Sequence, residues 1–131
     1  MITASALFKG QCHCGNIELD LVWPEGSSEI PARECRCSFC VKHGGVWTSN
    51  PGATLSVVLR RPDLLSKYEF GTQTATFYIC ARCGAVPFVT SEIAGHLYAV
   101  VNVNALENLD SARLSRGTFN VDGEGGRVPV G

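Results

Sequence analysis

The amino-acid sequence predicts a mainly β fold of antiparallel strands. Most segments either alternate apolar with polar residues or are rich in β-branched and aromatic types, which is typical of strands. Turn signals rich in glycine, proline and asparagine separate these segments at intervals of roughly ten residues. Helical patterns are scarce. The 131 residues suffice for one domain, since a domain typically holds about 100–200 residues.

Six segments are predicted to be strands, and the second shows the pattern most clearly. In it the apolar Ile17, Leu19 and Leu21 alternate with acidic residues, so that one face would be buried and the other would meet water. The predicted strands span residues 7–11, 16–22, 54–60, 65–70, 74–79 and 96–103. Turns are predicted at residues 24–28, 50–52, 61–63, 70–71 and 94–95.

Two short helical turns are also predicted. Ser38 would cap a turn that runs through Lys42 and ends at Gly44, because glycine adopts the left-handed closing conformation without a steric clash. The second turn would span residues 105–109, with Asn104 as its N-cap.

No linker, low-complexity tract or internal repeat divides the chain, so we expect a single domain over residues 1–131. Residues 115–131 contain five of the fourteen glycines. We therefore expect them to form a loosely attached tail.

Composition and charge exclude several classes of protein. With 45% hydrophobic and 18% charged residues, the chain is too apolar for a disordered protein. The net charge of −1 gives no support for a nucleic-acid partner. No stretch reaches the roughly 18 apolar residues of a membrane span. The first nine residues lack the basic region of a signal peptide, so the expected location is the cytoplasm.

Seven cysteines are the most informative feature of the composition. An odd number cannot form a complete set of intramolecular disulfides, and a reducing compartment would keep the thiols free. The cysteines are also clustered along the chain. Clustered free thiols indicate metal ligands.

Four of these cysteines fit one closed zinc site. Cys80 and Cys83 form a Cys-x-x-Cys turn followed by Gly84, and a structural zinc needs four thiolate or imidazole ligands in a tetrahedron, with bonds of about 2.3 Å to sulfur. Cys12 and Cys14, also followed by a glycine, supply a second pair. Joining the pairs closes a loop across most of the domain, which is where a cross-link constrains the unfolded chain most.

Cys35, Cys37 and Cys40, here called the thiol trio, remain. Three protein ligands and an open position distinguish a catalytic zinc from a structural one, so the sequence favours one closed site and one open site. Other interpretations stay open: two inert structural sites, one site with three spare thiols, or a trio that His43 completes as a closed site of three cysteines and one histidine.

The cysteine motifs also resemble those of a known family. They are Gly10-x-Cys12-x-Cys14-Gly15, Cys35-x-Cys37-x-x-Cys40 and Phe77-x-x-Cys80-x-x-Cys83-Gly84. In this order and spacing they resemble the glutathione-dependent formaldehyde-activating enzyme family, which is grouped with the centromere-protein-V-like proteins in the Mss4-like fold. The resemblance runs from residue 10 to about residue 106.

This resemblance implies an Mss4-like fold, antiparallel sheets held together by a zinc ion with four cysteine ligands, and two Zn²⁺ per chain. The implied structural ligands are Cys12, Cys14, Cys80 and Cys83, and the implied catalytic ligands are Cys35, Cys37 and Cys40. The implied activity is that of a carbon–sulfur lyase resembling S-(hydroxymethyl)glutathione synthase. Its substrates would be a thiol such as glutathione and an aldehyde such as formaldehyde. Iron also suits thiolates, but the resemblance favours zinc.

Several side chains near the trio have both a functional and an ordinary interpretation. The basic residues would either attract substrate carboxylates or merely offset the charge of the cysteinates; they are Arg33, Arg36, Lys42 and His43. His43 is also the candidate proton shuttle, since its ordinary pKa lies near neutrality. The candidate pocket walls are Phe39 and Trp47, although aromatic residues in small β domains usually belong to the core.

Two classes of function remain at this stage. One is a zinc-dependent enzyme in which a substrate thiol binds the open position and is deprotonated, because only a thiolate attacks carbon. The alternative is a non-enzymatic, zinc-held binding module of the Mss4-like fold. A fourth protein ligand beside the trio would close the site and favour the module.

Overall fold

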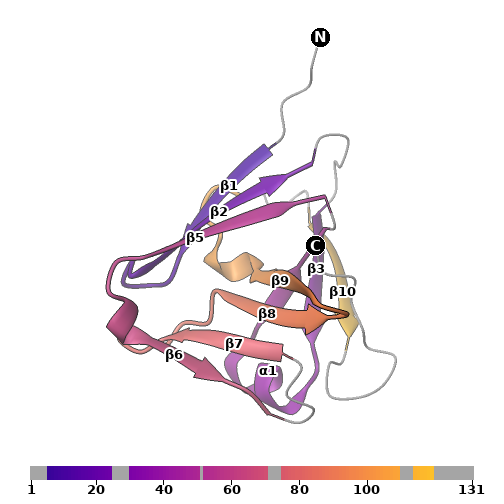
Figure 1. Cartoon of the computed structure of the whole chain (residues 1–131). Coiled ribbons are helices and arrows are strands. Elements are labelled where there is room, and N and C mark those ends of the chain that lie inside the picture. Colours follow the sequence, from indigo (N-terminus) through magenta and orange to yellow (C-terminus); the bar gives the residue numbers. More distant parts are fainter. Residues whose placement is uncertain (1–5, 25–29, 51, 71–74, 110–113, 120–131) are drawn as a thin grey trace.

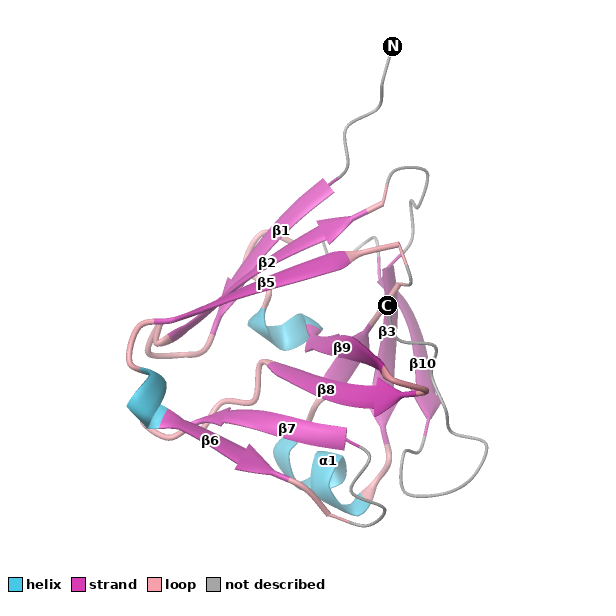
Figure 2. Cartoon of the chain, in the orientation of Figure 1, coloured by secondary structure: helices cyan, strands magenta, loops and turns pink. Residues whose placement is uncertain are grey.

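Two β-sheets make up most of the molecule (Figure 1). The computed structural model describes residues 6–24, 30–50, 52–70, 75–109 and 114–119. Figure 2 shows how little of this part is helical. The mainly β, antiparallel fold of the Mss4-like type that the sequence predicts is confirmed.

The smaller sheet has three antiparallel strands in the order β1-β2-β5. They are β1 (Ala6–Gln11), β2 (Ile17–Trp23) and β5 (Thr54–Leu59). The alternation in β2 sets the register: Ile17, Leu19 and Leu21 are buried, and Asp20 lies opposite Lys9, with which it forms an ion pair of 3.0 Å. One face of this sheet therefore supplies core residues.

The larger sheet has seven strands in the order β10-β3-β4-β9-β8-β7-β6. They are β3 (Ile30–Cys35), β4 (Val46–Thr48), β6 (Leu65–Tyr68), β7 (Ala75–Cys80), β8 (Phe88–Ile93), β9 (His96–Asn102) and β10 (Leu114–Phe119). Its pairs are antiparallel except for β10 and β3, which run parallel. This parallel pair is an exception to the all-antiparallel prediction.

Each face of the larger sheet packs against a different part of the molecule. Tyr78, Phe88 and Val101 lie side by side on β7, β8 and β9, and Phe88 and Val101 join the core beneath the smaller sheet. The neighbouring residues Phe77 and Val89 point to the opposite face, because side chains alternate along a strand. They form a second buried cluster against α1 (Ser38–His43).

Helix α1 begins and ends much as the sequence predicts, but its cap is one residue earlier. The Sγ of Cys37 accepts a hydrogen bond from the Cys40 amide, so Cys37 rather than Ser38 is the N-cap. Gly44 ends the helix at φ 81°, in the left-handed region as expected. A thiol already held at this turn replaces the hydroxyl that the sequence suggested.

The second predicted helix is wrong. Residues 106–109 are not helical; a 3-10 turn, η2 (Val103–Ala105), overlaps the predicted helix only at Ala105, and its cap is Asn102 rather than Asn104. The Asn102 side chain accepts a hydrogen bond from the Asn104 amide. It also donates to the Val86 carbonyl over 3.1 Å, so it is fixed at this position by both bonds. Another 3-10 turn, η1 (Pro62–Leu64), occupies the predicted turn at residues 61–63.

The six predicted strands are confirmed within one or two residues at most ends, but four further strands are not among them. The last of these, β10, contradicts the prediction of a loose tail from residue 115, because residues 115–119 pair with β3. The rest of that predicted tail lies outside the described residues, as does most of the predicted turn at residues 24–28.

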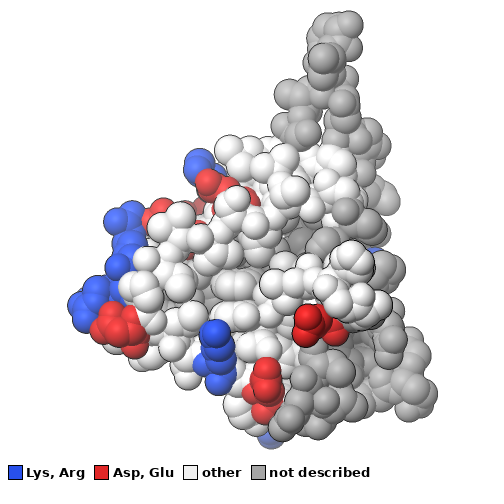
Figure 3. All heavy atoms as spheres, viewed as in Figure 1, with Lys and Arg blue, Asp and Glu red and all other residues white. Residues whose placement is uncertain are grey.

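Charges of both signs lie side by side on the face shown in Figure 3. Ion pairs among the described residues include Lys9–Asp20, Arg60–Glu18 and Arg61–Asp63. Within the described part of the chain, no helix has the length and apolar character needed to cross a membrane.

Candidate metal centres

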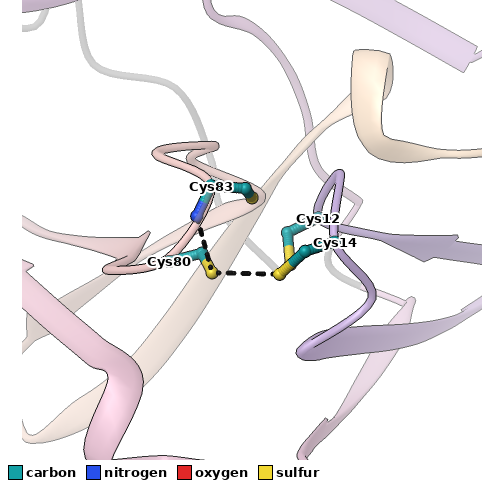
Figure 4. A group of neighbouring side chains, drawn as sticks. All are labelled: Cys12, Cys14, Cys80 and Cys83. Carbon is teal, nitrogen blue, oxygen red and sulfur yellow. Dashed lines mark hydrogen bonds between the residues drawn. The ribbon is translucent and has the colours of Figure 1, made fainter.

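The first candidate centre brings together two cysteine pairs that are far apart in the sequence (Figure 4). Cys12 and Cys14 lie in the turn between β1 and β2, whereas Cys80 ends β7 and Cys83 follows in the next turn. All four sulfurs lie within 4.8 Å of one another. We call this set the four-sulfur cluster.

The spacing of these sulfurs fits a zinc ion. The Sγ atoms of Cys14 and Cys80 are 3.6 Å apart, and those of Cys12 and Cys14 are 3.8 Å apart. Four sulfurs bonded to zinc in a tetrahedron at about 2.3 Å would be separated by about 3.8 Å. The donor set and its dimensions therefore match a structural zinc site.

Local backbone geometry explains why glycine follows each cysteine pair. Gly15 and Gly84 have φ angles of 86° and 82°, which a residue with a Cβ adopts only at a cost. Their amides close the turns onto the carbonyls of Cys12 and Cys80. The turns also direct amide donors at sulfur, as in the 3.3 Å contact from the Ile17 amide to the Cys12 Sγ.

The surroundings of Cys12 and Cys83 shift the pKa values of these two thiols in opposite directions. Burial raises the pKa of Cys83, but the amides of Ala85 and Cys14 and the neighbouring thiols outweigh it and lower the pKa to about 6. Burial raises the pKa of Cys12 to about 11 despite the Ile17 amide. The Cys83 thiol is thus ready to be a thiolate near neutral pH, whereas a cation would be needed to deprotonate the Cys12 thiol.

The second candidate centre is the thiol trio. Cys35 ends β3, Cys37 caps α1 and Cys40 lies within α1, so a single chain reversal gathers the three residues. Their sulfurs lie within 4.8 Å of one another. Each residue is at most 1% exposed. The trio is therefore more deeply buried than an open site was expected to be.

Backbone amides also hold the sulfurs of the trio. The Cys37 amide donates to the Cys35 Sγ over 3.4 Å, and the Cys40 amide donates to the Cys37 Sγ over 3.2 Å. Burial raises the pKa of Cys37, and the hydrogen bond with Cys35, together with burial, raises that of Cys40. The Cys37 and Cys40 thiols therefore stay protonated at neutral pH unless a cation is bound beside them. Three soft thiol donors are a set that zinc accepts.

No fourth protein ligand joins the trio among the described residues. His43, the residue that the sequence offered as a fourth ligand, is not part of the group. Its ring packs instead against Phe39, Trp47 and Phe77, at centroid distances of 4.6, 6.0 and 6.4 Å. Burial lowers the pKa of His43. Among the described residues, the trio can therefore supply three protein ligands to a metal ion.

Aromatic rings line one side of the trio, as the sequence suggested for Phe39 and Trp47. Phe39 contacts Phe77 edge-on at 4.8 Å and also meets Tyr68 and Phe70. Tyr68 is 44% exposed whereas Phe77 is 3% exposed, so this row of rings leads from the surface to the buried thiols. Tyr78 and Phe88 are not part of this row, because they stack on the opposite face of the sheet.

The predicted basic residues around the trio differ in their burial and in their partners. Arg36 pairs with Glu34 at the surface, and Lys42 is exposed at the end of α1. Arg33 and His43 are partly buried, and each has one buried nitrogen without a hydrogen-bond partner. His13 and His96 are exposed.

Two residues that matter to the trio were missed by the sequence analysis. Gly45 is buried under the rings of His43 and Trp47. Asn102 binds the Val86 carbonyl and accepts from the Val46 amide over 3.4 Å, so it joins three segments around the trio. The apolar run around Asn102 in the sequence was a signal for a buried amide, but nothing marked Gly45.

A shallow cavity of about 290 Å³ lies near the four-sulfur cluster. Its walls include Cys12, Val86 and Asn102, together with the polar side chains of Gln11 and Glu107. Val86 also belongs to the cluster around the trio. The cavity thus touches the surroundings of both candidate centres.

Comparison with known proteins decides the family. The model of the family described as "glutathione-dependent formaldehyde-activating enzyme" matches residues 7–121. The chain belongs to this family. All seven cysteines lie within the matched residues, so the formaldehyde-activating family model spans both candidate centres.

A solved structure supports the same assignment. The chain is similar to a Rhodobacter sphaeroides protein whose crystal structure was determined in a structural genomics programme, with 31% sequence identity and a TM-score of 0.63. The match covers 84% of this chain and 99% of that protein. No curated protein matches this chain. The formaldehyde-activating family is associated with zinc, and both thiol groups of this chain are of a kind that can hold it.

Proposed function

We propose that this protein is a zinc-dependent carbon–sulfur lyase that joins a thiol such as glutathione to formaldehyde or a related aldehyde. In this proposal Cys12, Cys14, Cys80 and Cys83 hold a structural zinc, and Cys35, Cys37 and Cys40 hold a catalytic one, giving two Zn²⁺ per chain. Membership of the formaldehyde-activating family supports the reaction class.

The observation that carries the proposal is the difference between the two centres. One has four thiols and the other has three, with no further protein ligand beside the three in the described part of the chain. A zinc with three protein ligands keeps a position for substrate, whereas a zinc with four cysteine ligands is closed. Only the trio therefore has room for chemistry on the metal.

The reaction needs one bond to form and one proton to move. The substrate sulfur attacks the aldehyde carbon, an S–C bond forms, and the thiol proton ends on the former carbonyl oxygen. A bound zinc would favour the thiolate form of a substrate whose ordinary thiol pKa lies near 8.5. The chain's own residues hold the ion through the trio and shield it with the rings of Phe39, Trp47 and Phe77.

The test compares the exchange of glutathione and formaldehyde with S-hydroxymethylglutathione, measured by NMR, in the presence and absence of protein. The protein-free blank is essential because thiols add to formaldehyde unaided. We expect the zinc-loaded protein to accelerate exchange and Cys37→Ser protein to match the blank. Exchange no faster than the blank, with both metals shown by elemental analysis, would refute the proposed activity.

The deep burial of the trio favours one alternative, a non-enzymatic binding module with two inert zinc sites. At most 1% exposure of each cysteine is what a closed site would show. Adding a small thiol to cobalt-loaded protein distinguishes the two functions. The thiol would change the spectrum of cobalt bound at an accessible trio, and it would leave the spectrum of a closed site unchanged.

A further inference from the structure

Two polar side chains on the trio's face of the larger sheet end in buried atoms that lack a hydrogen-bond partner. They are Nη1 of Arg33 and Nε2 of His43, two of the four such atoms among the described residues. Buried polar atoms in folded proteins are nearly always paired, because an unpaired one loses its bonds to water without compensation. Two unpaired atoms near one candidate site point to a ligand that completes them.

The register of β3 places Arg33 beside the trio. Arg33 lies opposite Trp47 in the β3–β4 pair, and it precedes Cys35 by two residues on the same strand. Both relations put its side chain on the face of the sheet that carries Trp47 and Cys35. Trp47 and the trio belong to one buried cluster.

His43 approaches the same tryptophan from α1. It follows Cys40 by three residues, so the two share a face of the helix. Gly45 makes the approach possible, since a Cβ there would lie 2.8 Å from Cε1 of His43 and 2.5 Å from Cζ2 of Trp47. Trp47 therefore has Arg33 as its neighbour in the sheet and His43 as its neighbour from the helix.

The charge of Arg33 is not balanced within the described part of the chain. No carboxylate there forms an ion pair with it, whereas Arg36 is paired with Glu34 over 3.4 Å. An arginine side chain remains charged at every physiological pH, and its planar fork matches a carboxylate. A carboxylate would therefore suit this side chain as a partner.

We propose that Arg33 and His43 form an anion-binding site beside the trio and select thiols that carry a carboxylate. This inference rests on the proposed function, because it requires a thiol to reach the trio. Arg33 binds the carboxylate, His43 completes the contact through Nε2, and the carboxylate anchors the molecule so that its sulfur meets the trio. Both are specificity-determining residues that bind a part of the substrate remote from the reacting sulfur.

The experiment measures thiol binding to protein loaded with Co²⁺, followed through the visible absorption of the cobalt. The probes are 3-mercaptopropionate and its neutral amide, 3-mercaptopropionamide, compared at equal thiolate concentration. We expect the wild-type protein to bind the carboxylate at least about tenfold more tightly, the range of a charge-assisted hydrogen bond. We expect Arg33→Gln and His43→Phe each to remove most of this preference. His43→Gln retains an N–H donor and should keep part of it.

Arg36→Gln is the matched control, because it removes a neighbouring guanidinium that already has a carboxylate partner. It should keep the full preference. If Arg33→Gln fails to bind cobalt, Arg33→Lys takes its place and should lower the preference several-fold, since an ammonium lacks the fork.

Two failures are distinguishable. Equal binding of both probes to the wild-type protein, or a preference that persists in Arg33→Gln, overturns the anion site and leaves the proposed function standing. A cobalt spectrum that neither thiol changes overturns the proposed function, and this inference with it.

Discussion

Only glycine fits at position 45, because of two neighbouring side chains rather than because of its backbone angle. An added Cβ would lie within 2.5 Å of the Trp47 ring and 2.8 Å of the His43 ring, closer than atoms can approach. Both rings pack against Phe77, and the His43 ring also packs against Phe39, so neither can move away freely.

We therefore predict that Gly45→Ala lowers the free energy of unfolding by about 1–3 kcal/mol, the usual cost of overpacking. Gly52→Ala is the control, because the nearest atom to its new Cβ, Cγ of Pro24, would be 3.3 Å away. Its effect should stay within about 0.5 kcal/mol. Urea unfolding measures the free energy of unfolding of both variants. Equal values for Gly45→Ala and Gly52→Ala would show that the rings beside Gly45 move aside at little cost.

The two kinds of glycine also show what sequence alone can predict. A glycine just after a cysteine pair or a short helix indicates a positive φ, and Gly44 and Gly84 confirm this. The signal is local, because the turn and the glycine are neighbours in the chain. Gly45 depends on where His43 and Trp47 come to lie in three dimensions, so no local pattern could reveal it.

Cys37 caps helix α1 and is also one of the three proposed catalytic zinc ligands. The Cys37 Sγ accepts from the Cys40 amide, a bond that a serine hydroxyl would replace and an alanine would not. Serine is also a poor substitute for thiolate as a zinc ligand.

Two substitutions of Cys37 should therefore separate these roles. We predict that Cys37→Ser and Cys37→Ala both lose one equivalent of zinc, as measured by elemental analysis. Cys37→Ala should be less stable than Cys37→Ser by about 1 kcal/mol, the cost of a lost N-cap. Global unfolding of Cys37→Ser would instead show that the trio is a second structural site.

Strand prediction succeeded where the pattern of residues was strong. β2 alternates cleanly, and it lies where the sequence placed it. β3 was missed because Pro31 and its charged residues look like a loop, and β4 because three residues are too few to show a period. β8 did carry a signal, since Phe88–Ile93 is rich in β-formers between two turns.

At the scale of the whole molecule, the four-sulfur cluster joins the two sheets. Cys12 and Cys14 come from the smaller sheet, and Cys80 and Cys83 from the larger one. The partition of seven cysteines into four and three was predictable from spacing and resemblance, and the structure brings together the same two groups. Their burial was not predictable, because it depends on how α1 packs against β7.

We predict that Cys80→Ser unfolds the domain. A structural zinc contributes about 10–16 kcal/mol to folding in zinc-finger peptides, which is comparable to or larger than the roughly 5–15 kcal/mol stability of a typical domain. Circular dichroism and thermal unfolding would show the loss, with Cys37→Ser as the folded control. A Cys80→Ser protein that melts cooperatively near the wild-type temperature would contradict the structural assignment.

The two thiol groups lie on opposite faces of one sheet, and β7 contributes to both sides, with Cys80 on one and Phe77 on the other. This layout places the proposed structural zinc site and the proposed catalytic zinc site on different faces of the sheet. In the proposed function, related chains can replace the residues around α1, and even lose the trio, because the four-sulfur cluster between the sheets keeps them folded. The proposed roles therefore predict relatives that lack Cys35, Cys37 and Cys40, keep the other four cysteines, fold normally and have no activity.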